Sequence, residues 1–177
     1  TDIYALSVDY SAEAPLTKEF FATVQNKLHW AITGQTAAEI VAARADSNQA
    51  NMGLTTWKNA PHGSIRKTDI GIAKNYLNED EIKLLGLLVE QYLAFAETMA
   101  QQRTPMYMQD WIDRLDSILQ LNGRELLTHA GKISHDMALK KSEAEFEKYA
   151  ITQKAIEKEQ SLKEIEEDIK KLQKPGQ

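Results

Sequence analysis

Apolar residues near the start of the chain recur with the period of an α-helix. Within residues 20–46, four large apolar side chains are spaced four residues apart: Phe20, Val24, Leu28 and Ile32. Side chains with this spacing share one face, so the segment predicts an amphipathic first helix. Gly34 favours the left-handed conformation that commonly ends a helix. Thr36 and Glu39 form a Thr-x-x-Glu capping box, which predicts that a second helix starts directly after this corner.

A second capping box, formed by Asn78 and Glu81, predicts a long helix that continues to about Gln102 and ends before a Thr-Pro pair. Six apolar residues of this segment recur at intervals of three and four: Ile82, Leu85, Val89, Tyr92, Ala96 and Met99. Neighbouring leucines broaden the stripe. A stripe of this breadth indicates burial against more than one neighbour.

The later segments are also helical in pattern. A helix is expected over residues 109–121, followed by an Asn-Gly break. A last helix is expected from the N-cap Ser134 past Tyr149 towards Leu172. Strand signals are nearly absent, so the chain is predicted to be all-α, with a compact multi-helix domain and a long charged C-terminal helix.

The C-terminal segment differs in composition from the rest. Residues 141–171 hold nine acidic and seven basic residues and few apolar ones. Four apolar residues are spaced three, four and three apart, as in a heptad seam: Leu162, Ile165, Ile169 and Leu172. They span about two heptads, whereas a coiled coil usually shows roughly three to four. We predict a helical domain over 1–150 and a charged helical tail over 151–177, extended or partly disordered, that pairs with a partner or a second copy.

The chain starts with Thr-Asp-Ile-Tyr and not with methionine. Ile3, Tyr4 and Leu6 resemble the end of an amphipathic helix. We therefore expect this chain to be the C-terminal part of a longer protein, whose remaining part joins it through a helix.

Composition is typical of a globular protein. The 177 residues suffice for the core of one domain, and 42% are hydrophobic and 27% charged. The net charge of −5 is too small to imply global attraction to nucleic acid or to an anionic membrane. The lack of cysteine excludes disulfides, thiolate catalysis and Cys-ligated zinc, and agrees with an expected cytoplasmic location. No apolar run approaches the roughly 20 residues of a membrane span, so no membrane partner is expected.

The best functional candidate is a basic stretch, residues 52–76, which overlaps the long loop expected over 46–63. It contains one acidic residue and four cations: Asp69, Lys58, Arg66, Lys67 and Lys74. Together with the Trp57 ring, these cations are suited to phosphate contact and base stacking. The alternative is that Trp57 fills the core while the cations form a solvated rim, and the frequency of surface Lys and Arg favours it. Thr68 and Asp69 are expected to start a short helix through Tyr76.

The four histidines give weak signals. His29 is the candidate functional histidine, because it lies near the C-terminal end of the first helix, where the helix dipole favours a protonated ring. A structural or partly exposed histidine is the commoner outcome. His62 occupies a Pro-His-Gly turn and is expected to be exposed. His129 and His135 are six residues apart, which is not the spacing of a helical metal-binding pair, so neither metal nor cofactor is expected.

No motif of a known enzyme class is present. The chain lacks the Gly-rich dinucleotide motif, the phosphate-binding P-loop and the Gly-x-Ser-x-Gly nucleophile motif. Many carboxylates lie on helix faces, but none stands out as an acid-base pair. These absences favour a protein that is not an enzyme.

Several separated blocks resemble the C-terminal region of the RhuM family, virulence-associated bacterial proteins. In chain order they are FFATVQNKLHWAITGQTAAEIVAARAD, NMGLTTWK, IRKTDIGIAKNYLNEDEI, YMQDWIDRLDSILQLN and LLTHAGKISHDMALKKSEAEFEKY. The similarity runs from about Asp2 to Tyr149. It implies that the full protein also carries an N-terminal segment similar to the helix-turn-helix-like, DNA-binding regions of phage antirepressors. The family supplies no accepted catalytic residues to carry over.

Some relatives join the same kind of N-terminal region to Fic-type domains, all-α enzymes that transfer a nucleotide moiety. Their signature is His-Pro-Phe-x-Asp/Glu-Gly-Asn-Gly-Arg. In this chain His29 is followed by Trp-Ala-Ile and His135 by Asp-Met-Ala, so the signature is absent. An active Fic enzyme is therefore not expected.

Two functional hypotheses follow. The favoured one is a non-enzymatic helical domain of a RhuM-like protein, which forms homo-oligomers or contacts a partner on behalf of a missing N-terminal DNA-binding region. The alternative is an enzyme acting on nucleotides or nucleic acid, such as a divergent Fic-like fold, with His29 as base and the basic stretch as phosphate clamp. The alternative requires a pocket in which His29 faces Arg66 or Lys67. A third reading, an effector delivered to host cells, rests on the family label alone.

Overall fold

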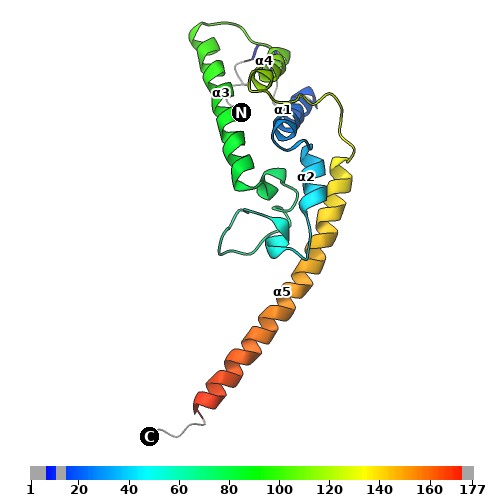
Figure 1. Cartoon of the computed structure of the whole chain (residues 1–177), viewed down its shortest axis with the longest axis vertical. Helices are drawn as coiled ribbons and strands as arrows, with labels where there is room; N and C mark the ends of the chain where they lie inside the picture. Colours follow the sequence, from blue (N-terminus) through cyan, green and yellow to red (C-terminus); the bar gives the residue numbers. More distant parts are fainter. Residues whose placement is uncertain (1–6, 11–14, 173–177) are drawn as a thin grey trace.

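The computed structural model describes residues 7–10 and 15–172. Within these ranges the chain forms five α-helices, two short 3-10 helices and no strand (Figure 1), which confirms the all-α prediction. The helices are α1 (Pro15–Thr33), α2 (Ala37–Arg44), η2 (Ala50–Gly53), η3 (Ala73–Tyr76), α3 (Glu79–Gln101), α4 (Met108–Leu121) and α5 (His135–Leu172). The helix end expected at Ile3, Tyr4 and Leu6 lies outside the described residues.

One hydrophobic core lies where α1, α3 and α4 pack together (Figure 1). We call it the α1–α3–α4 core, and its buried residues are Phe20, Val24, Ala31, Leu88, Tyr92, Ala96, Met106, Trp111, Leu115 and Leu119. The polar groups of its two largest rings are hydrogen-bonded. Tyr92 donates its hydroxyl hydrogen to the Trp111 carbonyl at 2.7 Å, and the Trp111 indole N–H donates to the Ser7 hydroxyl at 2.8 Å. Burial of these rings therefore leaves neither of these groups unsatisfied.

A second core joins α2, the segment between α2 and α3, and the first half of α5. We call it the α2–α5 core, and its buried residues are Ile40, Val41, Ala45, Met52, Leu54, Ile70, Ala73, Tyr76, Leu77 and Ala138. Ile82 and Leu85 of α3 pack against this core, while Leu88 and Tyr92 of the same helix belong to the other. The broad stripe of α3 thus contacts two neighbours, as its pattern predicted.

The corner between α1 and α2 has the predicted construction. Gly34 adopts a φ of +69°, in the left-handed region. The amide of Glu39 donates to the Thr36 hydroxyl at 3.3 Å, and the amide of Thr36 donates to the Glu39 carboxylate at 2.9 Å. Asn26 adds a bond across the corner, because its side-chain oxygen accepts the Ala37 N–H at 3.0 Å. The corner is therefore held by hydrogen bonds from both helices.

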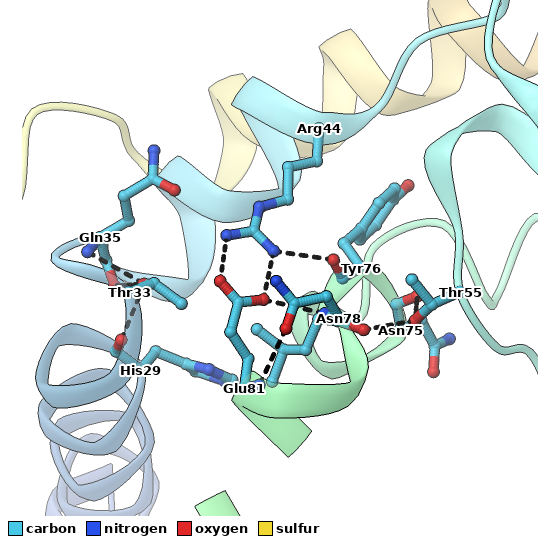
Figure 2. Close-up of polar contacts among 10 residues, drawn as sticks. His29, Thr33, Gln35, Arg44, Thr55, Asn75, Tyr76, Asn78 and Glu81 are labelled. Carbon is cyan, nitrogen blue, oxygen red and sulfur yellow. Dashed lines mark hydrogen bonds and ion pairs between the residues drawn. The ribbon is translucent and has the colours of Figure 1, made fainter. Parts of the chain in front are cut away.

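A two-pronged ion pair connects α2 to α3 (Figure 2). The Arg44 guanidinium contacts both oxygens of Glu81, at 2.6 and 2.7 Å, and donates to the Tyr76 carbonyl at 2.9 Å. Glu81 also completes the predicted capping box of α3 by accepting the Asn78 N–H at 2.9 Å. The hydrogen bond from Arg44 lowers the pKa of Glu81 below its ordinary value, so Glu81 is charged at neutral pH.

The short helix predicted from Thr68 to Tyr76 is only partly present, and the prediction was wrong over its first half. Helical structure is confined to the 3-10 helix η3, which begins at Ala73. Asp69 does not cap a helix there. Its carboxylate accepts the backbone N–H groups of Lys58, at 3.1 Å, and Arg66, at 2.8 Å. These bonds hold the preceding backbone in turns.

The last helix runs without a break from His135 to Leu172, across the predicted boundary at residue 150. Its first half packs on α2, and Phe146 and Tyr149 are its last residues against the α2–α5 core. From Ile151 to Lys171 every residue except Gln153 is exposed. We call residues 151–172 the arm; it extends away from the rest of the molecule (Figure 1) by roughly 33 Å at the rise of an α-helix. The division at residue 150 stays a prediction.

The Arg44–Glu81 pair predicts a measurable share of the stability. Glu81→Gln keeps the shape of the side chain but removes its charge, and should lower the free energy of unfolding by about 1–2 kcal/mol, because hydrogen bonds to charged groups are the stronger ones. Urea denaturation would measure the change. The matched control is Glu79→Gln, which removes a charge from the same helical turn but from an exposed residue. Equal effects of the two substitutions would contradict the assignment.

Candidate functional site

The basic stretch lies between α2 and α3 and is organised around Asp69. This residue is buried, with 3% of its surface exposed, and its two oxygens accept the amides of Lys58 and Arg66. Its own carbonyl accepts the side-chain N–H of Asn75 at 3.0 Å. The one acidic residue of the stretch thus binds backbone amides, and these bonds fix the backbone positions from which the side chains of Lys58 and Arg66 project.

Trp57 is half-buried and packs against the α2–α5 core. Its indole N–H donates to the Gly63 carbonyl at 2.6 Å, which closes the turn that contains His62. His62 itself is exposed. The ring therefore contributes to the fold, in agreement with the alternative in which Trp57 fills the core. Phosphate contact by the stretch stays a prediction.

The four cations differ in their partners. Lys67 forms an ion pair with Glu143 of α5, with the nitrogen and oxygen 3.1 Å apart. Lys58, Arg66 and Lys74 are exposed and form no ion pair with any described residue. No described carboxylate neutralises these three positive charges, although the guanidinium of Arg66 donates to the side-chain oxygen of Asn59 at 3.2 and 3.3 Å.

His29 is buried, with 8% of its surface exposed. Its carbonyl accepts the Thr33 hydroxyl at 2.8 Å, and Figure 2 shows its ring extending from α1 towards the first turn of α3. The ring nitrogen Nδ1 has no hydrogen-bond partner among the described residues. Burial lowers the pKa of His29 below its ordinary value, so the ring is neutral at pH 7. The helix-dipole argument, which favoured a protonated ring, omitted this burial.

The sequence alternative requires a pocket shared by His29 and the basic stretch. Three cavities of about 630, 510 and 470 Å³ open on the surface, and neither His29 nor Arg66 or Lys67 lines any of them. Within the described part of the chain, no cluster of three or more histidine or acidic side chains is arranged to hold a metal ion. His29 and the basic stretch are thus not brought together at these cavities.

The largest of the three cavities was missed by sequence reasoning. It lies between the α1–α2 corner, residues 129–133 and α5, and Trp30 and His129 meet in it edge to face with ring centres 4.7 Å apart. Glu39 holds the wall together by accepting the Lys132 N–H at 2.7 Å. Partial burial of the Glu39 carboxylate raises its pKa, but hydrogen bonds from the Lys132 and Thr36 amides outweigh this effect, so the pKa of Glu39 lies below its ordinary value. Residues 39 and 132 are too far apart in sequence for local pattern to reveal their contact.

Over the described ranges, no helix combines the length and apolar character that a bilayer crossing requires.

The buried His29 predicts a pH dependence of stability. Because its pKa is lower in the folded state than the ordinary 6.5, the unfolded chain binds a proton more readily. This contribution to stability is complete above pH 6.5 and is lost as the pH falls through the lowered pKa, with a slope of at most about 1.4 kcal/mol per pH unit. Urea denaturation between pH 7.5 and 5 should show a smaller slope for His29→Gln than for the unchanged protein. His62→Gln, at an exposed histidine, should leave the slope unchanged; equal slopes in all three proteins would contradict the assignment.

Comparison with known proteins identifies the family. The model of the Virulence protein RhuM family matches residues 1–158, which include α1 to α4 and all of α5 that packs on α2. No curated protein and no solved structure matches the chain. The match confirms the resemblance read from the separated sequence blocks, and the chain belongs to the Virulence protein RhuM family.

Proposed function

We propose that this chain is a non-enzymatic assembly module, which self-associates through the arm of α5. The observation that carries the proposal is a row of large apolar side chains that the fold leaves exposed along the arm. Their exposed fractions are 70% for Ile151, 52% for Leu162, 56% for Ile165 and 47% for Ile169.

The physical reason is the hydrophobic effect. Burying apolar surface contributes roughly 25 cal/mol per Å², and the cores of the globular part gain from it, since Leu115 and Leu119 are 0% exposed. Most of the stability of helices in proteins comes from the packing of an apolar face, and not from helix propensity. A row of apolar residues on such a helix is therefore best explained by a helical partner.

The family relationship suggests what the assembly serves. RhuM-like proteins are expected to carry an N-terminal DNA-binding region, and self-association of this domain would bring two such regions together. We propose that the protein acts in the bacterial cytoplasm, a reducing compartment in which proteins rarely contain disulfides, and a chain without cysteine agrees with this.

A second, weaker contribution comes from the basic stretch. We propose that Lys58, Arg66 and Lys74 add phosphate contacts to nucleic acid bound elsewhere on the full protein. The supporting observation is that these three cations are exposed and form no ion pair with a described residue, while Lys67 is paired. Trp57 takes no part in base stacking in this proposal, because its ring packs on the α2–α5 core.

The phosphate contacts predict a change in salt dependence. Combining Lys58→Ala, Arg66→Ala and Lys74→Ala should weaken binding to a single-stranded oligonucleotide and reduce the slope of log affinity against log salt by about 2, at roughly 0.7 per contact. Fluorescence anisotropy over a salt series would measure both. A control that removes three other exposed lysines, at positions 18, 83 and 140, makes the same change in net charge. Equal losses in both variants would show a general charge effect and contradict a site at this stretch.

The arm predicts the oligomeric state. Light scattering should give a mass of more than one chain at micromolar concentration, and Ile165→Asp should convert it to the monomer by placing a charge in the apolar row. The control is Ile156→Asp, because Ile156 is 42% exposed but lies on the opposite side of the helix, about 180° from Ile165. A monomeric unchanged protein over a wide concentration range would overturn the proposal.

A further inference from the structure

We propose that the arm pairs with the arm of a second copy of this chain, parallel and in register, as a two-stranded coiled coil over residues 151–172. The inference rests on the proposed function, since it requires self-association. It adds the identity of the partner surface, the direction of the two helices and their alignment.

The apolar row on the arm extends beyond the four residues from Leu162 to Leu172 towards the N-terminus. Continuing the heptad from Leu162 towards the N-terminus places Ala155 and Ile151 on the same seam, and both are exposed. The complete seam has seven positions, in the alternating order d, a, d, a, d, a, d: Ile151, Ala155, Lys158, Leu162, Ile165, Ile169 and Leu172. Together they span roughly three heptads, which reaches the length at which a coiled coil becomes a reasonable assignment.

Nothing within the described part of the chain covers this seam. Beyond Tyr149 the arm no longer contacts the α2–α5 core, and it extends away from the other helices in Figure 1. The helix is continuous through Tyr149, so the seam is held in an extended helix that needs no further ordering before it pairs. A second copy of this chain offers a seam of the same length and spacing, which suits it as the occupant.

The charges beside the seam favour the parallel direction. In a parallel pair, position g of one helix lies opposite the following position e of the other, which sets Lys154 against Glu159 of the second copy, twice by symmetry. Lys154 forms no ion pair with a described residue of its own chain. Glu159 binds Lys163 of its own helix at 2.7 Å, and its carboxylate retains capacity for a second cation. Both pairs are attractive.

The antiparallel alternative is repulsive. If the apolar layers are matched with Leu162 opposite Ile165, position e faces position e, and Glu159 lies opposite Glu166 of the second copy, again twice. Like charges at these flanking positions lower the stability of the pair. A self-paired seam with this charge distribution therefore prefers helices that point the same way.

The number of apolar layers favours the in-register alignment. In register, the two copies of Lys158 share one layer, while every other layer pairs identical apolar residues. A shift of one heptad would set Lys158 of one chain against Ile165 and Lys158 of the other against Ile151, and would reduce the seven layers of the seam to five. Lys158 occupies a d position, and two lysines in one layer lower the stability of the pair, so the in-register alignment is favoured by its larger number of apolar layers.

The lack of cysteine in the chain provides a direct test. Ile169→Cys and Ile151→Cys each place one thiol in the seam far from its centre, so that a self-disulfide requires parallel, in-register helices. Under mild oxidation, non-reducing gels should show covalent dimers at least about 10-fold faster than for Ile156→Cys, on the outer side of the arm, because paired helices raise the local thiol concentration. If one cysteine substitution weakens the pairing of the helices, the other seam position still tests the proposal.

The outcomes separate the inference from the function on which it rests. A mixture of Lys158→Cys and Ile169→Cys chains of different length should give no more mixed disulfide than Ile156→Cys does. Preferential formation of that mixed product, with a dimeric mass by light scattering, would establish antiparallel helices and overturn this inference while leaving self-association in place. A mass of three or four chains would overturn the two-stranded arrangement alone. A monomeric unchanged protein would overturn both proposals.

Discussion

The carboxylate of Glu81 is the point on which the arrangement of this molecule depends. It accepts hydrogen bonds from the Asn78 backbone and from the guanidinium of Arg44, so it starts α3 and attaches that helix to α2. α3 contributes to both hydrophobic cores, while α2 carries the first half of α5. Glu81 thus connects the helix that contributes to both cores with the helix on which the first half of α5 packs, and the arm continues from that half (Figure 1).

The local parts of the fold could be read from the sequence because their causes are local. The capping boxes at Thr36 and Asn78, the left-handed Gly34 and the helical periodicity involve residues a few positions apart, and each is present as predicted. Contacts between distant segments left no such signal. Glu39 bonds the Lys132 backbone and Glu145 bonds the Ser47 backbone, and these bonds decide how residues 129–133 and α5 lie on α2. The same cause explains Asp69, which looked like a helix cap and instead binds the backbone of Lys58 and Arg66.

The candidate site shows a similar limit. Charge counting selected the basic stretch as a cationic segment, but it could not distinguish Lys67, which is paired with Glu143, from the three cations that form no ion pair with a described residue. Helix position drew attention to His29, yet the burial of its side chain sets its charge state, and burial depends on tertiary packing. The cavity lined by Trp30 and His129 combines three segments, none of which has a motif of its own. The helix of the C-terminal tail, by contrast, was predicted from local pattern and is present.

Because α5 is one continuous helix, the direction in which the seam faces is fixed relative to the α2–α5 core. The same helix presents Phe146 and Tyr149 to the α2–α5 core and, from Ile151 onwards, the seam to the solvent. Because each residue turns an α-helix by about 100°, the side of the molecule that the seam faces is determined by the number of residues between the two. Insertion or loss of a single residue near position 150 would leave both the core and the seam chemically intact while pointing the seam in another direction. The number of residues between the core-facing part of α5 and the seam thus sets the direction of the seam, whichever residues occupy these positions.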